Sequence, residues 1–343
     1  MTTSSSTTLE EEASVAAVQK KSGRPVAIKR LIIGAQAMER TASGSIHREI
    51  EILKQVSHKN VIPLLDVIHR RTSRVESMLV FPRIELDLDR FLKDPLAETP
   101  NHLIQSLMRQ LLQGLAHLHG KQIIHRDLKP ANLLVSKTGD LKIADLGSAR
   151  KLPNRDFTTD MTNLVVSMWY RAPELLMGEV EYGPEVDMWS VGCILSEVFL
   201  HEVLLQGSDE IDQLTRIFRL CWDPSDFRYR QALKDKWVQT SSGQLAKPAL
   251  SCIQPRKTLA LRDDWRFGGA SANMRQLLQQ LLQMDAKRRI QAMDALQSPF
   301  IKAASFEPHP LTYKAPQLDV GATNSGFPHR AFWDSRYQQY VHF

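Results

Sequence analysis

The sequence has little cysteine, no long uncharged apolar run and no concentrated block of one charge. Its three cysteines, Cys193, Cys221 and Cys252, show no CxxC or metal-type spacing. This argues against a disulfide or zinc framework and favours a reducing compartment. The longest apolar stretch, Val186 to Leu200, contains two carboxylates and is too short to span a bilayer of about 30 Å. It is expected to form a fully buried helix, and no membrane partner is predicted.

The charge balance is only mildly basic. The 343 residues include 44 Lys and Arg against 38 Asp and Glu, a formal net charge of +6. With 43% hydrophobic and 24% charged residues, the chain has an ordinary globular composition. The densest basic groups, at 69–71 and 287–289, are too short for a nucleic-acid-binding arm, so no nucleic-acid partner is expected.

The pattern along the chain predicts four regions. Residues 1–13 are rich in Ser and Thr and then acidic, which predicts a disordered leader. Residues 14–83 predict a small sheet with one helix, and residues 84–300 a larger, mainly helical region. Residues 301–343 have weak periodicity and predict a tail that lies over the domain or is partly free.

Within these regions, hydrophobic periodicity predicts individual elements. A helix over residues 103–118 has the strongest pattern, and apolar residues from Ile46 to Val56 predict the single helix of the smaller region. The other predicted strands are 14–19, 24–31, 61–67, 78–81, 133–135 and 141–143, and the other predicted helices are 186–200, 208–221, 273–284 and 291–297.

A set of short motifs in a fixed order carries the chemistry. Residues 125–132 read HRDLKPAN, residues 145–147 read DLG, and residues 172–174 read APE. Upstream, residues 26–29 read VAIK, and Glu49 follows Lys29 by twenty positions. This combination resembles the eukaryotic protein kinase family over most of the chain, from about residue 15 to 300. A lone Asp, Lys or Asn is usually a solvated surface group, but the ordered set favours function.

The resemblance implies phosphoryl transfer from ATP to a protein hydroxyl, with Mg²⁺ as cofactor. Asp127 would accept the proton of the hydroxyl, and Lys129 would neutralise the phosphate in transit. Asn132 and Asp145 would hold Mg²⁺ through hard oxygen donors. The Lys-Pro-x-Asn form of the motif at 129–132 is that of Ser/Thr-specific members.

The resemblance also implies the nucleotide contacts. Lys29 would bind the α- and β-phosphates and be held in place by Glu49, although a charge at a strand end is also typical of an edge gatekeeper. Phe81 would be the gatekeeper residue beside the adenine. The rest of the adenine pocket would be formed by a hinge at 82–84, which includes Ile84, and by Leu134. His125 and Leu146 are expected in the core, and Glu174 and Arg289 as a structural ion pair.

Two further stretches resemble cyclin-dependent and mitogen-activated kinases: WYRAPE at 169–174 and GSDEIDQL at 207–214. No Thr-x-Tyr activation pair is present, and Thr162 stands twelve residues before Glu174, where cyclin-dependent kinases carry their activating threonine. By the same resemblance, three arginines would form a pocket for its phosphate: Arg48, Arg126 and Arg150. Ser167 would bridge Asp127 and Lys129. Val166 and Arg171 would shape a groove that prefers proline after the target Ser or Thr.

The sequence departs from the family at its start. The glycines of the Gly-x-Gly-x-x-Gly loop would fall at Thr8, Glu10 and Ala13, and none is Gly. Three interpretations stay open: a truncated or misassembled chain, unusual ATP binding, or a non-catalytic pseudokinase. Residues 43–49 also differ from the cyclin-docking sequence, so a cyclin partner is uncertain. These departures are similar to those of fungal single-subunit CDK-activating kinases, and a divergent cell-cycle-related kinase fits almost as well.

The fold class predicted is α+β: a bilobed protein kinase fold with a small β-rich N-lobe and a large α-helical C-lobe. The function predicted is that of a Ser/Thr protein kinase related to the cell cycle or transcription, acting on protein substrates that include other cyclin-dependent kinases. The protein is expected as a monomer or a cyclin heterodimer in nucleus and cytoplasm. The alternative is a pseudokinase scaffold that binds partner kinases without phosphotransfer.

Overall fold

The structure is a computed structural model, and it describes most of the chain in several stretches. These are residues 11–19, 22–33, 42–71, 75–152, 165–179, 181–221, 264–303 and 309–313.

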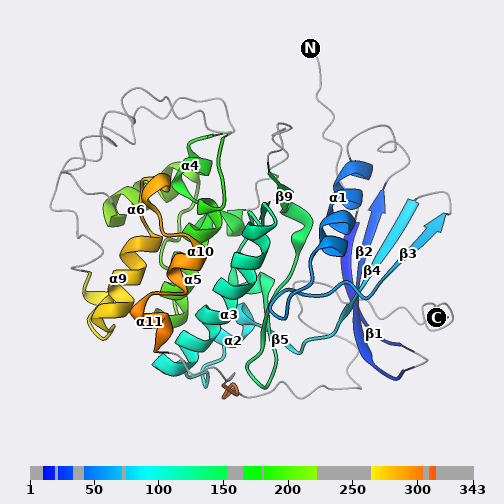
Figure 1. The fold of residues 1–343 in the computed structure, drawn as a ribbon, viewed down its shortest axis with the longest axis horizontal. Coiled ribbons are helices and arrows are strands. Elements are labelled where there is room, and N and C mark those ends of the chain that lie inside the picture. Colours follow the sequence, from blue (N-terminus) through cyan, green and yellow to red (C-terminus); the bar gives the residue numbers. More distant parts are fainter. Residues whose placement is uncertain are drawn as a thin grey trace, which may run out of the picture.

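The N-lobe is one antiparallel sheet with a helix beside it (Figure 1). Its strands are β1 (Glu11–Val18), β2 (Pro25–Ile33), β3 (Asp66–Arg71) and β4 (Val75–Pro82), in the order β1-β2-β4-β3. The helix is α1 (Ala42–Gln55). Ala27 and Lys29 on the central strand β2 are two residues apart, so both side chains project from the same face of the sheet.

Two N-lobe expectations differ from the structure. β1 begins at Glu11, inside the stretch expected to be a disordered leader, because residues 11–13 pair with β2 as part of a continuous ladder. The strand predicted over 61–67 is wrong, since β3 covers Asp66–Arg71 instead. The apolar residues Val61 and Ile62 belong to a buried loop, where the amide of Ile62 donates to the carbonyl of Ile143 at 2.9 Å.

The C-lobe is built from helices, with short strands near the N-lobe (Figure 1). The strands form two small sheets, β5-β7-β8 and β6-β9. Their bounds are β5 (Leu86–Asp87), β6 (Ile123–Ile124), β7 (Leu133–Val135), β8 (Leu141–Ile143) and β9 (Arg150–Lys151). The α-helices are α2 (Leu88–Leu92), α3 (Asn101–Gly120), α4 (Pro173–Leu176), α5 (Glu185–Leu200), α6 (Glu210–Cys221), α9 (Ala272–Leu281), α10 (Ala292–Ala295) and α11 (Pro299–Lys302).

Short 3₁₀ helices join several of these elements. They are η2 (Pro130–Asn132), η3 (Leu146–Ser148), η4 (Val165–Tyr170), η6 (Trp265–Phe267) and η7 (Ala286–Arg288). The bilobed α+β architecture predicted from the sequence is confirmed.

The C-lobe core is centred on α3 and α5. The apolar positions of α3 from Leu103 to Leu118 are almost wholly buried, as its periodicity predicts. Every residue of α5 from Val186 to Val198 is buried, which confirms the expected buried helix. In the part of the chain that the structure describes, no helix is long and apolar enough to cross a membrane.

The start of the expected tail is part of the domain. Ile301 is fully buried in α11, which extends to Lys302. Residues 309–313 lie against the C-lobe, where the amide of Leu311 donates to the carbonyl of Lys137 at 3.2 Å. The ring of Tyr313 meets Phe91 of α2 edge-on, with centroids 6.3 Å apart. This described part of the tail is therefore laid over the domain, while residues 314–343 lie outside the described residues.

Candidate active site

The two lobes are connected by an ammonium group placed between two carboxylates. Lys29 of β2 lies 3.0 Å from Glu49 Oε1 on α1 and 2.8 Å from Asp145 Oδ1, which follows β8. Glu49 is buried and the side chain of Lys29 is 11% exposed. The ion pair between Lys29 and Glu49 predicted from their spacing is therefore confirmed, and the structure adds Asp145 as a second partner of the same ammonium.

Asp145 is held as an anion in a constrained position. Desolvation would raise the pKa of its carboxyl, but the neighbouring Lys29 ammonium outweighs this and lowers the pKa to about 2. Its backbone has φ 59°, in the left-handed region that non-glycine residues seldom adopt. Gly147 lies close beside it, since a Cβ there would be 3.3 Å from Asp145 Oδ1 and 3.4 Å from Glu49 Oε2.

The residues of the HRDLKPAN segment converge on one carboxylate. Lys129 Nζ lies 2.7 Å from Asp127 Oδ2. The Asn132 amide donates to the backbone carbonyl of Asp127 at 2.8 Å and to its Oδ2 at 3.2 Å. Asp127 and Lys129 are about one-fifth exposed, so the carboxylate is oriented by two neighbours and still reaches the solvent.

A buried carboxylate on α5 holds this segment in place. Asp187 is 1% exposed and accepts from the backbone amides of His125 at 2.9 Å and Arg126 at 2.8 Å. His119 Nε2 lies 2.8 Å from Asp187 Oδ2. Arg126, which has φ 72°, is thereby kept in the left-handed region directly before Asp127. Sequence reasoning missed this role, although a carboxylate inside a mainly apolar, buried helix signals a buried partner.

The remaining residues of this segment behave as expected from the resemblance. His125 is fully buried and donates through Nε2 to the carbonyl of Ala144 at 2.9 Å, while its Nδ1 accepts from the amide of Asp127 at 3.3 Å. Leu146 is also buried. Both are core residues, as predicted.

The donor set fits a magnesium ion shared with phosphate oxygens. Asn132 uses its amide NH₂ on Asp127, and its Oδ1 has no hydrogen-bond partner among the described residues. Asp145, with its lowered pKa, is ionised at neutral pH. Within the described stretches no group of three or more His, Cys, Asp or Glu residues could hold a metal ion. An oxygen pair of this kind suits Mg²⁺, which often takes one or two protein ligands and completes its shell with water and phosphate.

The segment after β4, proposed to bind adenine, has a backbone donor without a partner among the described residues. Phe81, Ile84 and Leu134 are all half-buried. Phe81 stands opposite Ala27 in the sheet. The amide of Arg83 donates to the carbonyl of Pro25 at 3.3 Å, whereas the amide of Ile84 makes no hydrogen bond to any described residue. The Ile84 amide of the segment after β4, which has no partner among the described residues, is therefore a donor for a heterocyclic base.

The expected phosphate pocket is described only in part. Pairing of β6 with β9 puts Ile124 opposite Arg150, so Arg126 and Arg150 lie on neighbouring segments. The buried Nε of Arg126 has no hydrogen-bond partner among the described residues, and its guanidinium lies 5.9 Å from the centre of the Tyr182 ring. Arg48 is half-buried on α1, directly before Glu49.

Other predicted residues of this region are described unevenly. Thr162 lies outside the described residues, and the side chains of Val166 and Ser167 in η4 are not described either. Arg171 is 12% exposed, with an Nη1 4.0 Å from Glu210 at the start of α6.

The predicted structural ion pair is confirmed. Arg289 forms a two-pronged contact with Glu174, at 2.6 Å and 3.1 Å, and both residues are buried. The same guanidinium donates to the backbone carbonyls of Gln283 and Glu185, so its charge is well satisfied. The pair joins the APE segment to the end of the C-lobe.

Comparison with known proteins agrees with this geometry. The family model described as the protein kinase domain matches residues 12–301. Cyclin-dependent kinase 12 of Drosophila melanogaster is 36% identical over 264 residues, which cover 74% of this chain and 22% of that protein. Probable cyclin-dependent kinase 9 of Schizosaccharomyces pombe (strain 972 / ATCC 24843) is 39% identical over 237 residues, which cover 64% of this chain and 39% of that protein. The matches thus span less than half the length of either relative. The chain belongs to the protein kinase family, in its cyclin-dependent-kinase-like (CMGC) Ser/Thr branch.

Proposed function

We propose that this protein is an active serine/threonine kinase that transfers the γ-phosphate of ATP to protein substrates. The observation that carries the proposal is the double contact of Lys29, at 3.0 Å from Glu49 and 2.8 Å from Asp145. It joins the phosphate-binding lysine, the helix of the N-lobe and the metal-binding carboxylate in one assembly. Positioning of this kind supplies most of the catalysis in phosphoryl transfer.

The proposed reaction uses groups already oriented in the structure. A Ser or Thr hydroxyl placed at Asp127 gives its proton to the carboxylate as its oxygen bonds to the γ-phosphorus. The bond from that phosphorus to the bridging oxygen breaks, and ADP leaves. Lys129, 2.7 Å from Asp127, holds this carboxylate in place and offsets negative charge on the transferred group. Mg²⁺, when bound by Asn132 and Asp145, supplies neutralisation of the phosphate charge.

Regulation and substrate preference are proposed from the same assembly. Phosphorylation of Thr162 would give Arg126 the partner that its Nε lacks among the described residues, with Arg48 and Arg150 alongside. Arg171, placed near Asp127 and Glu210, would favour proline after the target residue. Other cyclin-dependent kinases are proposed as substrates, and a cyclin as a partner is compatible with the names of the relatives.

A second candidate function is a scaffold that binds partner kinases without phosphotransfer. The observation that favours it is the N-terminal strand, where Ala13, the expected position of the last loop glycine, pairs with Arg30 inside a regular ladder. A glycine-free strand would not approach the triphosphate as closely as a flexible loop. The two functions differ in nucleotide binding, since a binder must be stabilised by Mg-ATP through mass action.

The experiment measures transfer from Mg-ATP to a proline-directed peptide and to a kinase-dead cyclin-dependent kinase, without added cyclin. Lys29→Met is the blank, because it removes both ion pairs of the ammonium. Transfer to the partner kinase alone would support the proposal that this protein activates other cyclin-dependent kinases. Transfer to the peptide would support a general proline-directed kinase. No transfer to either substrate by a chain whose melting temperature rises with Mg-ATP would contradict the proposed catalysis.

A further inference from the structure

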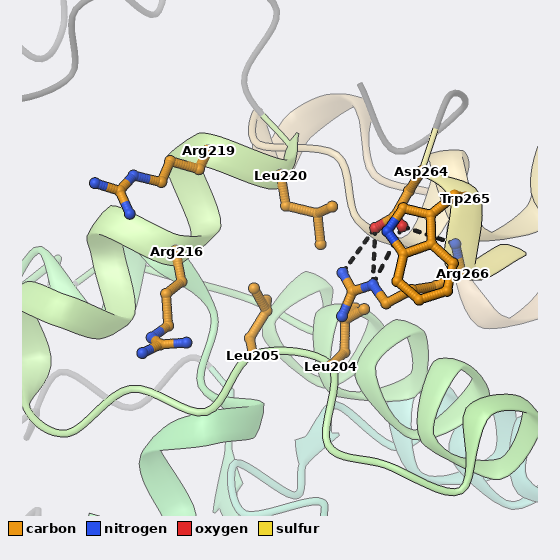
Figure 2. Close-up of a pocket in the computed structure, with 8 residues that line it drawn as sticks. All are labelled: Leu204, Leu205, Arg216, Arg219, Leu220, Asp264, Trp265 and Arg266. Carbon is orange, nitrogen blue, oxygen red and sulfur yellow. Dashed lines mark hydrogen bonds and ion pairs between the residues drawn. The ribbon is translucent and has the colours of Figure 1, made fainter. Parts of the chain in front are cut away.

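A hollow on the C-lobe lies among elements that contribute nothing to the catalytic cluster. It has a volume of about 320 Å³ and is lined from three places: the loop after α5, the C-terminal half of α6 and the turn η6. Figure 2 shows Leu204, Leu205 and Leu220 in the middle, between two arginines of α6 on one side and Trp265 and Arg266 on the other. All three leucines are less than 8% exposed, so the floor of the hollow is apolar and firmly packed.

One wall of the hollow is the solvent-exposed indole of Trp265. Trp265 is 81% exposed, the highest value among the large hydrophobic residues of the described chain. Its two neighbours face each other, because Arg266 donates to Asp264 through Nε and Nη2, the latter at 2.7 Å. The Asp264 carboxylate also accepts from the backbone amide of Arg266 at 3.0 Å. This clamp fixes the turn and leaves Trp265 at the mouth of the hollow instead of in the core.

Among the described residues, the charged groups at the rim of the hollow are paired except for one arginine. Arg266 lies 2.7 Å from Asp264 and 4.0 Å from Glu202, and Arg216 is paired with Asp212 at 2.9 Å. Arg219, one helical turn from Arg216, is exposed and has no ion pair or hydrogen bond to any described residue. A guanidinium with no partner in the described part of the chain, next to an exposed indole and an apolar floor, is typical of an interaction site.

We propose that this hollow docks an acidic peptide segment of a partner protein, with one large apolar side chain on the leucine floor. A carboxylate next to that side chain would pair with Arg219, and Trp265 would cover the apolar group. Charge complementarity selects this occupant, since the guanidinium would repel a basic segment and a neutral one would leave it unpaired. The volume lies at the low end of the range for ligand pockets, about 300–1,000 Å³, and is matched to a side-chain anchor.

The site is distinct from the proposed catalytic function, because none of its lining residues contacts the Lys29 or Asp127 clusters. A second copy of this chain is a weaker candidate, because a stable dimer needs about 800 Å² from each partner and this surface offers one small hollow. Binding would therefore be retained in a catalytically inactive chain, and the two proposals fail independently.

The test is fluorescence polarisation with the full chain and a labelled hexapeptide, Asp-Glu-Leu-Phe-Glu-Asp. Two matched peptides serve as controls. In the first, the four acidic residues are replaced by lysines, and in the second, Leu-Phe is replaced by Ser-Ser. Arg219→Glu and Trp265→Ala remove the two exposed recognition groups without touching the packed floor. Arg24→Glu is the matched control, the same charge reversal at an exposed arginine of the β1–β2 turn.

The acidic Leu-Phe peptide is expected to bind to the intact chain. Each of the two test variants is expected to raise the Kd of this peptide by about tenfold or more, since a charged hydrogen bond or an aromatic anchor is lost. Arg24→Glu is expected to leave its Kd unchanged, and the lysine and serine peptides to bind at least tenfold more weakly. The proposal is overturned if the acidic peptide shows no saturable binding up to millimolar concentration, or if Arg219→Glu and Arg24→Glu bind it equally. Concentration-dependent dimers that Trp265→Ala abolishes would instead make this face a contact between copies.

Discussion

Replacing Asp187 by Asn tests whether the buried carboxylate on α5 holds the segment before Asp127. Asp187 accepts from the amides of His125 and Arg126, at 2.9 Å and 2.8 Å, and from His119 at 2.8 Å. Asparagine has nearly the same shape but offers one oxygen and one NH₂. At least one of the three donors must then face another donor in a place that is 1% exposed.

The expected cost follows from these contacts. A buried donor left without a partner costs about 1–3 kcal/mol, and each hydrogen bond to a charged group contributes about 1.5–3 kcal/mol. We therefore expect the Asp187→Asn chain to lose about 3 kcal/mol of unfolding free energy. Arg126 is held at φ 72° by these bonds, so the segment would also relax and shift Asp127. A displacement of about 1 Å can reduce catalysis about a hundredfold.

Urea unfolding at pH 7 gives the change in free energy, and a transfer assay gives kcat. The matched control is Asp294→Asn, the same substitution at an exposed carboxylate of α10, which is expected to change stability by less than about 0.5 kcal/mol. If Asp187→Asn were as stable and as active as this control, the carboxylate would not position the catalytic segment.

Three further predictions follow from other contacts. Burial of Glu197 raises the pKa of its carboxyl from 4.5 to about 6, so the folded state prefers the protonated form. The free energy of unfolding is therefore expected to fall by about 2 kcal/mol as the pH rises from 4.5 through 6. Urea unfolding between pH 4.5 and 8 is expected to show this loss in the intact chain and a weaker dependence of the unfolding free energy on pH in Glu197→Gln. The same pH dependence in both chains would contradict the assignment to Glu197. Gly147→Ala places a methyl carbon 3.3 Å from Asp145 Oδ1, so this carboxylate must shift by a few tenths of an ångström, and kcat is expected to fall about fourfold. Gly120→Ala, whose added carbon has no neighbour within 4 Å outside its own helix, is expected to leave kcat unchanged, and equal rates for the two variants would refute this reasoning. Arg289→Lys loses the two-pronged contact with Glu174 and is expected to lower the unfolding free energy by about 3 kcal/mol, while the Kd for ATP stays unchanged. An unaltered urea midpoint would contradict the structural role of this ion pair.

Sequence periodicity predicts the elements that are buried in a regular way. The helix expected over 103–118 lies within α3, and the strands at 133–135 and 141–143 coincide with β7 and β8. Prediction failed for most of the strand at 61–67, because Val61 and Ile62 are buried in the core and pair with Ile143 only through an isolated β-bridge. The strand β3 that follows is an edge strand with polar residues, which gives little periodic signal.

The site shows the same division. Motif spacing identified Lys29, Glu49 and Asp145, and in the structure the Lys29 ammonium lies 3.0 Å from Glu49 and 2.8 Å from Asp145. It did not identify Asp187, whose partners lie about sixty residues away along the chain, or the contact of Tyr313 with α2. Such contacts depend on how helices pack, and no local pattern in one sequence records that packing.

The central claim is that the assembled groups catalyse phosphate transfer, and the direct measurement compares the intact chain with Asp127→Asn. Single-turnover transfer from Mg-ATP gives the rate, and the melting temperature across an ATP titration gives nucleotide binding. We expect Asp127→Asn to reduce the rate at least about a hundredfold, because the proton acceptor is lost, and to leave the Kd for ATP within a few-fold. Full transfer by Asp127→Asn, or none by the intact folded chain, would contradict the account.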